Sequence, residues 1–409
     1  MNFNETKELL KKYDQEQLLE FYDELDENDR KNLIAQIEKI DFSLLKLLEK
    51  EDKSVVKGKI TPLLGAVKTG DIEKNREEYY AIGKDAIQHT KVAAVLLAGG
   101  QGTRLGSDKP KGMYNIGLTK DVYIFEMIIR NLLDVVKDTG CMIPLFIMTS
   151  EKNNNDTIEF LEEKNFFGYN REYVRFFVQD MAPSCNYDGK IYLEEKGKVS
   201  MSPNGNGGWF TSFINSDCIK RADELGVEWL NVFAVDNVCQ RIADPCFIGA
   251  TIKAGVPVGA KVVAKNAPDE RVGVLCLEDG RPSIVEYYEL TEELMTAKDE
   301  NGDPAYNYGV ILNYLFRIKE LRDIVNENLP VHVVEKKIPY IDKMGNKIKP
   351  EQTNGYKFET LILDMIHMLD GCLPYEVVRN KEFAPIKNKT GVDSVESARK
   401  ILTENGVEL

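Results

Sequence analysis

The amino-acid sequence predicts an α/β protein in which a mixed, mostly parallel central sheet is flanked by helices. Through the middle of the 409-residue chain, short apolar strand-like segments alternate with helix-like segments. Parallel strands need long crossover connections, usually helical, so this alternation is typical of such a sheet. The chain is long enough to bury a large core, and its content of 43% hydrophobic and 29% charged residues is ordinary for a globular protein.

The N-terminal part, residues 1–88, is predicted to be a small helical lobe followed by a connection. Up to about residue 50, apolar residues recur at helical spacing with Asp, Glu and Lys between them, which predicts two helices and then a third over 44–48. We expect these apolar stripes to form core rather than a partner-binding surface. Residues 51–90 are polar and mixed, which predicts a connection with short helices. The two stripes are Leu9, Leu10, Leu18, Leu19, Tyr22 and Leu25, and then Leu33, Ile34, Ile37 and Ile40.

Residues 89–345 are predicted to form the main α/β domain, and residues 346–409 to complete it and end in a short C-terminal segment. Ligands of such sheets bind at the carboxyl ends of strands, where the glycine-rich loop after Leu97 and Asp236 are both expected. The expected strands are 92–97, 144–148, 174–178 and 229–235, the expected helices are 125–136 and 154–163, and β patterns at 259–264, 273–277 and 283–288 predict a further β layer.

The most informative segment is the glycine-rich stretch LAGGQGTRLGSDKPKGMYNIG at residues 97–117. Its glycines allow backbone N–H groups to approach an anion, and successive N–H groups in such a turn form a concavity for phosphate oxygens. Arg104, Lys109 and Lys111 add positive charge. The stretch lacks the GxxxxGK[ST] spacing of a Walker loop, and it fits the dinucleotide pattern GxGxxG only loosely, without a convincing acidic partner. Three basic residues beside glycines favour phosphate binding over a solvated turn.

Composition and charge disfavour several classes of function. The net charge of -14 argues against general nucleic-acid binding, whereas a local basic pocket in an acidic protein suits a small anionic ligand. No apolar run has the length of a membrane span, and the N-terminus does not resemble a signal peptide. A zinc site is disfavoured, because the seven scattered cysteines form no CxxC motif and the three histidines are widely separated. Free cysteine thiols suit a reducing cytosol. We therefore expect a cytoplasmic protein that binds neither nucleic acid nor membrane.

The segment LAGGQGTRLGSDKPKGMY closely resembles the uridylyltransferases that make UDP-sugars, in particular the UDP-N-acetylhexosamine pyrophosphorylases. The resemblance implies a Rossmann-like nucleotidyltransferase fold of the GT-A type. It also implies a reversible, Mg²⁺-dependent reaction of UTP with N-acetylglucosamine 1-phosphate, which gives UDP-N-acetylglucosamine and pyrophosphate. Further segments match in family order: IMTS at 147–150, KVSM at 198–201, VDN at 235–237, GAKVV at 259–263, VEY at 285–287, NGYK at 354–357 and FAPIKN at 383–388.

The resemblance also implies roles for individual residues. Basic side chains would stabilise the transferring phosphates, and the Asp236 carboxylate would hold Mg²⁺, a hard cation that prefers oxygen ligands. The residues alone leave Asp236 open as a helix N-cap, and they leave Gln179 and Glu286 open as surface residues. The expected catalytic residues are Arg104, Lys111 and Lys387. The expected nucleotide contacts are Leu97, Ala98, Gly99, Gly100, Gln179 (to uracil), Gly205, Asp236 and Lys357, and the expected sugar contacts are Asn206, Glu286, Tyr287 and Asn307.

Two departures from the family pattern keep alternatives open. The family carries Gly-Asn-Ile where this chain has Gly309-Val310-Ile311, and that Asn is associated with the sugar pocket. Glucose 1-phosphate, or a range of sugar phosphates, is therefore the closest alternative substrate. The chain ends about 20 residues beyond Lys387, whereas eukaryotic relatives continue into a larger C-terminal domain, so oligomer contacts that depend on that domain are not carried over. We expect a monomer or a weak homo-oligomer. An alternative of another class is a nucleotide-sugar binding protein without turnover, which retention of the basic residues and Asp236 disfavours.

Overall fold

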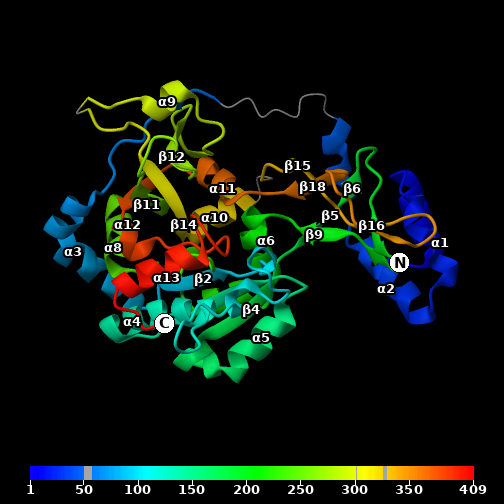
Figure 1. The fold of residues 1–409 in the computed structure, drawn as a ribbon, viewed down its shortest axis with the longest axis horizontal. Coiled ribbons are helices and arrows are strands. Elements are labelled where there is room, and N and C mark those ends of the chain that lie inside the picture. Colours follow the sequence, from blue (N-terminus) through cyan, green and yellow to red (C-terminus); the bar gives the residue numbers. More distant parts are fainter. Residues whose placement is uncertain (50–57, 301, 326–328) are drawn as a thin grey trace. The chain divides into compact units, whose positions relative to one another are not determined.

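The computed structural model describes residues 1–49, 58–300, 302–325 and 329–409, and its chain divides into two compact units (Figure 1). The larger unit combines Lys57–Gln179, Trp209–Asn328 and Leu363–Leu409. The smaller unit combines Met1–Val56, Asp180–Gly208 and Leu329–Ile362. This division by contacts differs from the sequence ranges 1–88, 89–345 and 346–409, because the smaller unit gathers three segments that are distant in the sequence.

The larger unit is built on a mixed sheet whose strands run in the order β1-β12-β14-β10-β2-β3-β4 within the described residues. The side formed by β10 (Trp229–Ala234), β2 (Val92–Leu97), β3 (Leu145–Thr149) and β4 (Val174–Val178) is parallel throughout. Antiparallel pairing begins at β14 (Tyr308–Arg317), which pairs with β10, β11 and β12. The predicted α/β sheet with flanking helices is confirmed. The other strands of the sheet are β1 (Ile60–Thr61), β11 (Val258–Ala264), β12 (Val274–Glu278), β13 (Arg281–Val285) and β19 (Cys372–Glu376).

The centre of the sheet explains why β2 is a continuous apolar run. All six of its residues are buried, as expected for a parallel strand that is covered on both faces. β10 pairs with β2 in parallel, with Ala234 opposite Leu97. The two strands therefore end together, and the glycine-rich loop and Asp236 leave the sheet at the same edge. This is the edge at which open α/β sheets bind their ligands.

Two helices beside this sheet pack backbone against backbone. α3 (Thr69–Gln88) lies along α8 (Pro245–Ala254) (Figure 1). A side-chain carbon added at Gly83 would lie 1.9 Å from the first carbonyl oxygen of α8, and one added at Gly249 would lie 1.8 Å from a carbonyl oxygen of α3. Both distances are far shorter than a van der Waals contact, so the close approach of the two helices requires glycine at each position.

Three predicted elements need correction. The described part of the stretch 51–90 contains one 20-residue helix, α3, where short helices were expected. The predicted strand 283–288 ends at Val285, so Glu286 and Tyr287 lie in the turn that follows. The first N-terminal stripe does not lie on one helix, because α1 (Phe3–Lys12) ends before Asp14, whose φ of 54° turns the chain into short 3₁₀ segments. The remaining helices are α4 (Ile124–Thr139), α5 (Asn154–Glu163), α6 (Trp209–Asn215), α7 (Asp217–Leu225), α9 (Glu292–Thr296), α10 (Ile318–Val325), α11 (Ile362–Met368), α12 (Arg379–Glu382) and α13 (Val395–Glu404).

The smaller unit joins the N-terminal helices to short strands from much later in the chain. Its core contains Leu10 of α1 and Leu33 of α2 (Glu27–Glu38), together with Ile341 and Phe358. The expectation that the N-terminal stripes form core is confirmed for their buried members. The strands of this unit are β5 (Met181–Pro183), β6 (Cys185–Asn186), β7 (Leu193–Glu195), β8 (Lys198–Val199), β9 (Met201–Pro203), β15 (His332–Lys336), β16 (Tyr340–Ile341), β17 (Lys347–Ile348) and β18 (Gly355–Glu359).

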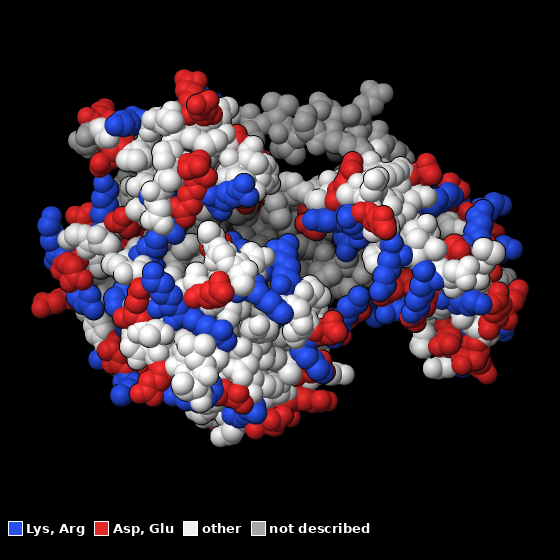
Figure 2. All heavy atoms as spheres, viewed as in Figure 1, with Lys and Arg blue, Asp and Glu red and all other residues white. Residues whose placement is uncertain are grey.

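The surface carries charge of both signs. Figure 2 shows Lys and Arg interspersed with Asp and Glu over the viewed face. Local arrangements of charge, rather than the net charge of -14, must therefore decide where an anion binds. Among the described helices, none combines the length and the apolarity needed to cross a bilayer.

Candidate active site

The glycine-rich loop that follows β2 is shaped by its own backbone hydrogen bonds. The Gly102 N–H donates to the Lys109 carbonyl at 2.9 Å, and the Lys111 N–H donates to the Gly100 carbonyl at 3.1 Å. These bonds fold the loop back on itself, so Lys111 lies beside the start of the loop. The N–H groups of Gly99 and Gly100 donate to no other described residue, which leaves them available to an anion.

A buried asparagine that the sequence analysis missed holds the first residues of this loop. The Asn153 Nδ2 donates to the Ala98 carbonyl at 3.0 Å, and its Oδ1 accepts the Ser150 N–H at 2.7 Å. The Ala98 N–H donates to a carbonyl of β3 at 2.8 Å, and the Leu97 carbonyl accepts a hydrogen bond at 3.2 Å from Val235. The side chains of Leu97 and Ala98 are buried, so these two expected nucleotide contacts are engaged within the protein itself.

Lys111 lies at the centre of a cluster of charges. Its Nζ is 3.6 Å from Asp236 Oδ2, and its side chain is only 16% exposed. Burial lowers the pKa of the Lys111 ammonium, the Asp236 carboxylate opposes this shift, and Lys387 and Arg104 lower the pKa further. The structure therefore brings Asp236 and the other two expected catalytic cations, Arg104 and Lys387, within electrostatic reach of Lys111. Lys109, from the same loop, instead forms an ion pair with Asp156 at 3.2 Å on the surface.

Asp236 is fixed by its main chain rather than by capping a helix. It lies two residues beyond the end of β10, and its carbonyl accepts the Ile386 N–H at 2.9 Å. The neighbouring Asn237 strengthens this junction, because its Oδ1 accepts the Ala384 N–H at 2.9 Å and its Nδ2 donates to the Glu382 carbonyl at 2.8 Å. The open N-cap alternative is not realised, since the next helix, α8, is capped by a different aspartate.

A chain of buried amides supports the segment that carries Asp236. The Asn231 Nδ2 donates to Asn313 Oδ1 at 2.8 Å, and the Asn313 Nδ2 donates to Gln240 Oε1 at 3.1 Å. The Gln240 Nε2 in turn donates to the carbonyls of Ala234 and Asn237, at 2.7 and 2.9 Å. Fully satisfied buried networks of this kind make a loop rigid. The polar residues inside the otherwise apolar strands β10 and β14 were the sequence signal for this network.

Lys387 follows directly from the junction at Ile386. Its Nζ donates to Asp393 Oδ2 at 3.0 Å, and its own N–H donates to the Asp393 carbonyl at 2.7 Å. The side chain is 45% exposed. The lysine is therefore anchored at its backbone, and its ammonium is accessible to an anion.

Gln179 lies close to the glycine-rich loop. It follows β4, its N–H donates to the Thr149 carbonyl at 2.8 Å, and it is buried. A side-chain carbon at Gly99 would lie 2.8 Å from Gln179 Oε1. The Gln179 amide therefore lies against the backbone of Gly99, so the structure brings together two residues expected to contact the nucleotide.

Two of the residues connected with the sugar meet near Gly273. A side-chain carbon built on Gly273 would lie 3.5 Å from Glu286 Oε1 and also 3.5 Å from Val310 Cγ2. The Glu286 carboxylate and the Val310 side chain therefore both lie beside Gly273. Tyr287 is on the outside of the turn, with the Arg271 guanidinium 5.9 Å from its ring centre.

Asn307 has a structural task in the described chain. Its Oδ1 accepts the Lys265 N–H at 2.9 Å, and its carbonyl accepts the Gly309 N–H at 3.2 Å. These bonds connect the ends of β11 and β14. The side-chain acceptor of this expected sugar contact is thus used by the protein.

The other expected site residues belong to the smaller unit. Gly205 has a φ of 88°, and a side-chain carbon there would lie 2.2 Å from the Thr360 carbonyl oxygen. The Asn206 Oδ1 accepts the Ile362 N–H at 3.0 Å, which ties the same loop to the chain after β18. Lys357 lies within β18, opposite Val334 of β15. Within this unit, Gly205 and Asn206 therefore form a fixed loop.

Comparison with known proteins decides the family. The family model described as UTP–glucose-1-phosphate uridylyltransferase matches residues 42–408. The chain belongs to this uridylyltransferase family. The UDP-N-acetylglucosamine pyrophosphorylase of Saccharomyces cerevisiae is 36% identical, over 97% of this chain and 88% of its own. The mouse UDP-N-acetylhexosamine pyrophosphorylase-like protein 1 is 35% identical, over 94% of this chain and 80% of its own.

Solved structures agree with the family. A putative UDP-N-acetylglucosamine pyrophosphorylase from Entamoeba histolytica has a TM-score of 0.77 at 31% identity, covering 85% of this chain and 88% of its own. The uridine diphosphate N-acetylglucosamine pyrophosphorylase of Trypanosoma brucei has a TM-score of 0.82 at 27% identity, and the match covers 97% of this chain and 83% of that chain. UDP-glucose pyrophosphorylase structures from Leishmania major, at 17% identity, share the fold. The family resemblance and the fold inferred from the sequence are therefore confirmed.

Proposed function

We propose that this nucleotidyltransferase forms UDP-N-acetylglucosamine and pyrophosphate from UTP and N-acetylglucosamine 1-phosphate. A phosphate oxygen of the sugar phosphate would attack the α-phosphorus of UTP. The bond from this phosphorus to the bridging oxygen of the β-phosphate would break, and pyrophosphate would leave with the electron pair. The attacking phosphate is already ionised, so the reaction needs no protein nucleophile or general base.

The observation that carries this proposal is the cluster of Arg104, Lys387 and Asp236 around Lys111, beside the N–H groups of Gly99 and Gly100 in the glycine-rich loop. The reaction brings together two strongly anionic substrates. Preorganised cations and N–H donors that face the developing charge are the largest catalytic contribution to such transfers. We assign Arg104, Lys111 and Lys387 to the phosphates that react and leave, and the N–H groups of Gly99 and Gly100 to the nucleotide phosphates.

A divalent metal is general in this family, and we propose Mg²⁺ with Asp236 as its protein ligand. Among the described residues, no group of three or more His, Cys, Asp or Glu could hold a metal. This suits Mg²⁺, which in nucleotide sites takes one or two carboxylates and completes its shell with phosphate oxygens and water. When bound, Mg²⁺ would neutralise charge on the phosphates, while Lys111 would contact oxygens that the metal does not reach.

Gln179 is proposed to recognise uracil, and the space between Glu286 and Val310 to receive the sugar. A buried amide offers a donor and an acceptor together, which matches the polar edge of uracil. The Glu286 carboxylate would accept hydrogen bonds from sugar hydroxyls, and the Val310 side chain would contact the acetyl methyl group. The further proposed nucleotide contacts are Leu97, Ala98, Gly205 and Lys357, and the further proposed sugar contacts are Asn206, Tyr287 and Asn307.

The experiment that tests this function is pyrophosphate release from UTP and Mg²⁺ with a panel of sugar 1-phosphates. We expect N-acetylglucosamine 1-phosphate to give the highest kcat/KM. A higher value for glucose 1-phosphate would favour the closest rival, a UTP–glucose-1-phosphate uridylyltransferase or a broad-specificity enzyme. Calorimetric binding of UTP without pyrophosphate release from any sugar phosphate would instead favour a non-catalytic nucleotide-sugar binding protein. The cytoplasmic location and the monomeric or weakly oligomeric state remain predictions.

A further inference from the structure

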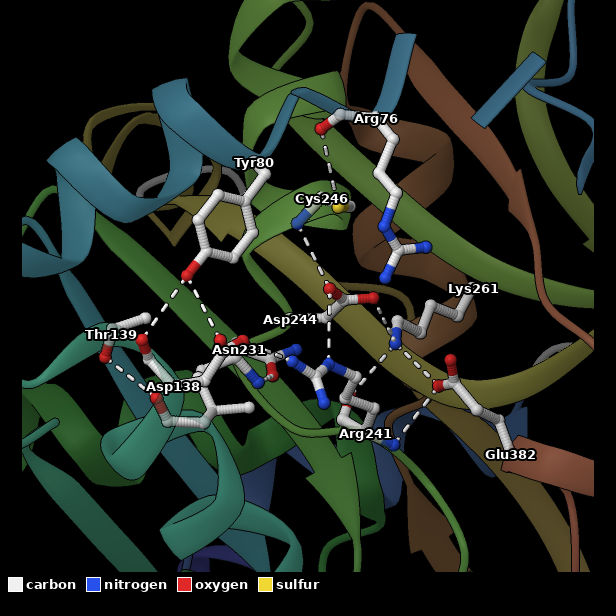
Figure 3. Close-up of polar contacts among 12 residues, drawn as sticks. Arg76, Tyr80, Asp138, Thr139, Asn231, Arg241, Asp244, Cys246, Lys261 and Glu382 are labelled. Atoms are coloured by element: carbon white, nitrogen blue, oxygen red, sulfur yellow. Dashed lines mark hydrogen bonds and ion pairs between the residues drawn. The ribbon is translucent and has the colours of Figure 1, made fainter. Parts of the chain in front are cut away.

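The larger unit contains a fully buried lysine that the proposed chemistry does not use. Lys261 belongs to β11, and its side chain has no solvent exposure. Its Nζ donates to the Arg241 carbonyl at 3.0 Å, to Asp244 Oδ2 at 3.3 Å and to Glu382 Oε2 at 2.6 Å (Figure 3). All three ammonium donors thus have a partner, and these partners come from two different segments of the chain.

A buried ion pair is weak support for stability, because removal of the charges from water offsets most of their attraction. Burial raises the pKa of the Glu382 carboxyl, and Lys261 opposes that shift. In proteins generally, replacement of a buried ion pair by hydrophobic residues of similar volume is often neutral or stabilising. The charges and their directional hydrogen bonds therefore point to a task other than stability.

The partners of Lys261 belong to the two segments that carry the proposed phosphate-binding groups. Arg241 is in the segment that begins at Asp236, and Glu382 begins the segment that leads to Lys387. Glu382 also binds the first segment, because its Oε2 accepts the Arg241 N–H at 3.1 Å. The lysine ammonium therefore closes a bridge between the backbone of one segment and the side chain of the other, as Figure 3 shows.

The same two segments are joined again closer to the proposed site. There the Ile386 N–H donates to the Asp236 carbonyl, and Asn237 binds the Glu382 carbonyl. The Lys261 bridge adjoins these bonds, because Glu382 takes part in both. A shift at the bridge would therefore displace the bonded backbone that carries Asp236 and Lys387.

We propose that Lys261 is a positioning residue for nucleotidyl transfer, which holds the Asp236 and Lys387 segments in register without contact with the substrates. This inference rests on the proposed function, since it assumes that both segments act on phosphates. A misplacement of about 1 Å at a reacting centre can cost about 10²-fold in rate. Loss of the bridge should therefore lower kcat and raise the Mg²⁺ requirement, while UTP binding through Gln179 and the glycine-rich loop is retained.

The test compares Lys261→Met with the double variant Lys261→Met/Glu382→Gln, and Lys253→Met is the matched control. Met keeps the length of the side chain and removes its charge, and the double variant leaves no unpaired carboxylate at Glu382. Lys253 forms an ion pair with Glu78 on the surface of the same unit, so its loss should leave turnover unchanged. The measurements are kcat from pyrophosphate release, the Mg²⁺ concentration for half-maximal rate, the calorimetric Kd of UTP and the thermal unfolding midpoint.

We expect Lys261→Met to lower both the unfolding midpoint and kcat, the latter by about 10- to 100-fold, with a Kd for UTP within about threefold of wild type. The double variant should recover much of the stability but keep the low kcat and the raised Mg²⁺ requirement. Recovery of wild-type kcat in the double variant would overturn the inference, because Lys261 would then serve only to neutralise Glu382. If Lys261→Met does not fold, the kcat and the Mg²⁺ requirement of the double variant alone test the inference. Absence of turnover in the wild-type protein with every sugar phosphate would instead overturn the proposed function.

Discussion

Replacement of Lys111 by Met tests the proposed phosphate site most directly. The ammonium lies 3.6 Å from the Asp236 carboxylate and is 16% exposed, so it acts in a poorly solvated place. A unit negative charge on a phosphate oxygen held at the same distance would interact with the ammonium by about 4–5 kcal/mol at an effective dielectric constant of about 20. Only the part of the phosphate charge that develops in the transition state affects kcat, so we expect a loss of about 3–4 kcal/mol, or about 10²–10³-fold. Uracil recognition should survive, because Gln179 and the loop backbone are unchanged.

The assay is pyrophosphate release at saturating UTP and sugar phosphate, together with calorimetric binding of UTP. Lys109→Met is the matched control, because Lys109 comes from the same loop but is 61% exposed and paired with Asp156. We expect its kcat to stay within about twofold of wild type, as is usual for exposed ion pairs. If Lys111→Met keeps the native fold and turns over within about tenfold of wild type, Lys111 does not stabilise the transition state and the electrostatic reasoning fails.

Three further outcomes follow from the same site. Asp236→Asn should raise the Mg²⁺ concentration needed for half-maximal rate and strongly reduce kcat, and a native-like variant with an unchanged Mg²⁺ titration would remove Asp236 as the metal ligand. Val310→Asn adds an amide beside Glu286 and should sharpen the preference for N-acetylated sugar phosphates by about 1–3 kcal/mol; the ratio of kcat/KM for N-acetylglucosamine and glucose 1-phosphates measures this, and an unchanged ratio would place Val310 outside the sugar pocket. Because burial lowers the pKa of Lys111, the folded protein holds fewer protons than the unfolded chain between that pKa and about 10.4, so this group should make folding more favourable as pH rises through that window. Urea unfolding of wild type and Lys111→Met across alkaline pH should show this difference, and parallel stability curves would contradict it.

The sequence made the main edge of the site predictable because periodicity and strand ends are local properties. β2 and β10 are apolar runs followed by a glycine-rich loop and by Asp236, and parallel pairing alone brings their carboxyl ends together. By contrast, nothing local connects Lys387 to this edge. Its approach depends on backbone bonds from Ile386 and on Asn237, which only a folded chain brings together.

Other failures have equally physical causes. α3 was not predicted as a long helix because it packs against α8 through Gly83 and backbone atoms, so no strong apolar stripe marks its face. The end of β13 at Val285 could not be derived, since strand patterns continue into the turn that carries Glu286. Asn153 could not be singled out, because an asparagine beyond a strand more often forms a surface turn than a buried clamp.

The order of the site residues along the chain has a consequence for biosynthesis. Lys111 and Asp236 are made well before Lys387, which lies about 280 residues after Lys111. At about 5–20 residues per second, a ribosome needs roughly 15–55 s to cover that distance. In the later part of this interval, after Asp236 and Lys261 have been made, the Asp236 segment lacks the segment 382–387 that it bonds in the folded protein, and Lys261 lacks Glu382. A nascent chain therefore leaves the Lys261 ammonium one hydrogen bond short, since its partners Arg241 and Asp244 are already made. We expect nucleotide to stabilise the fold as a ligand only after the last segment has joined.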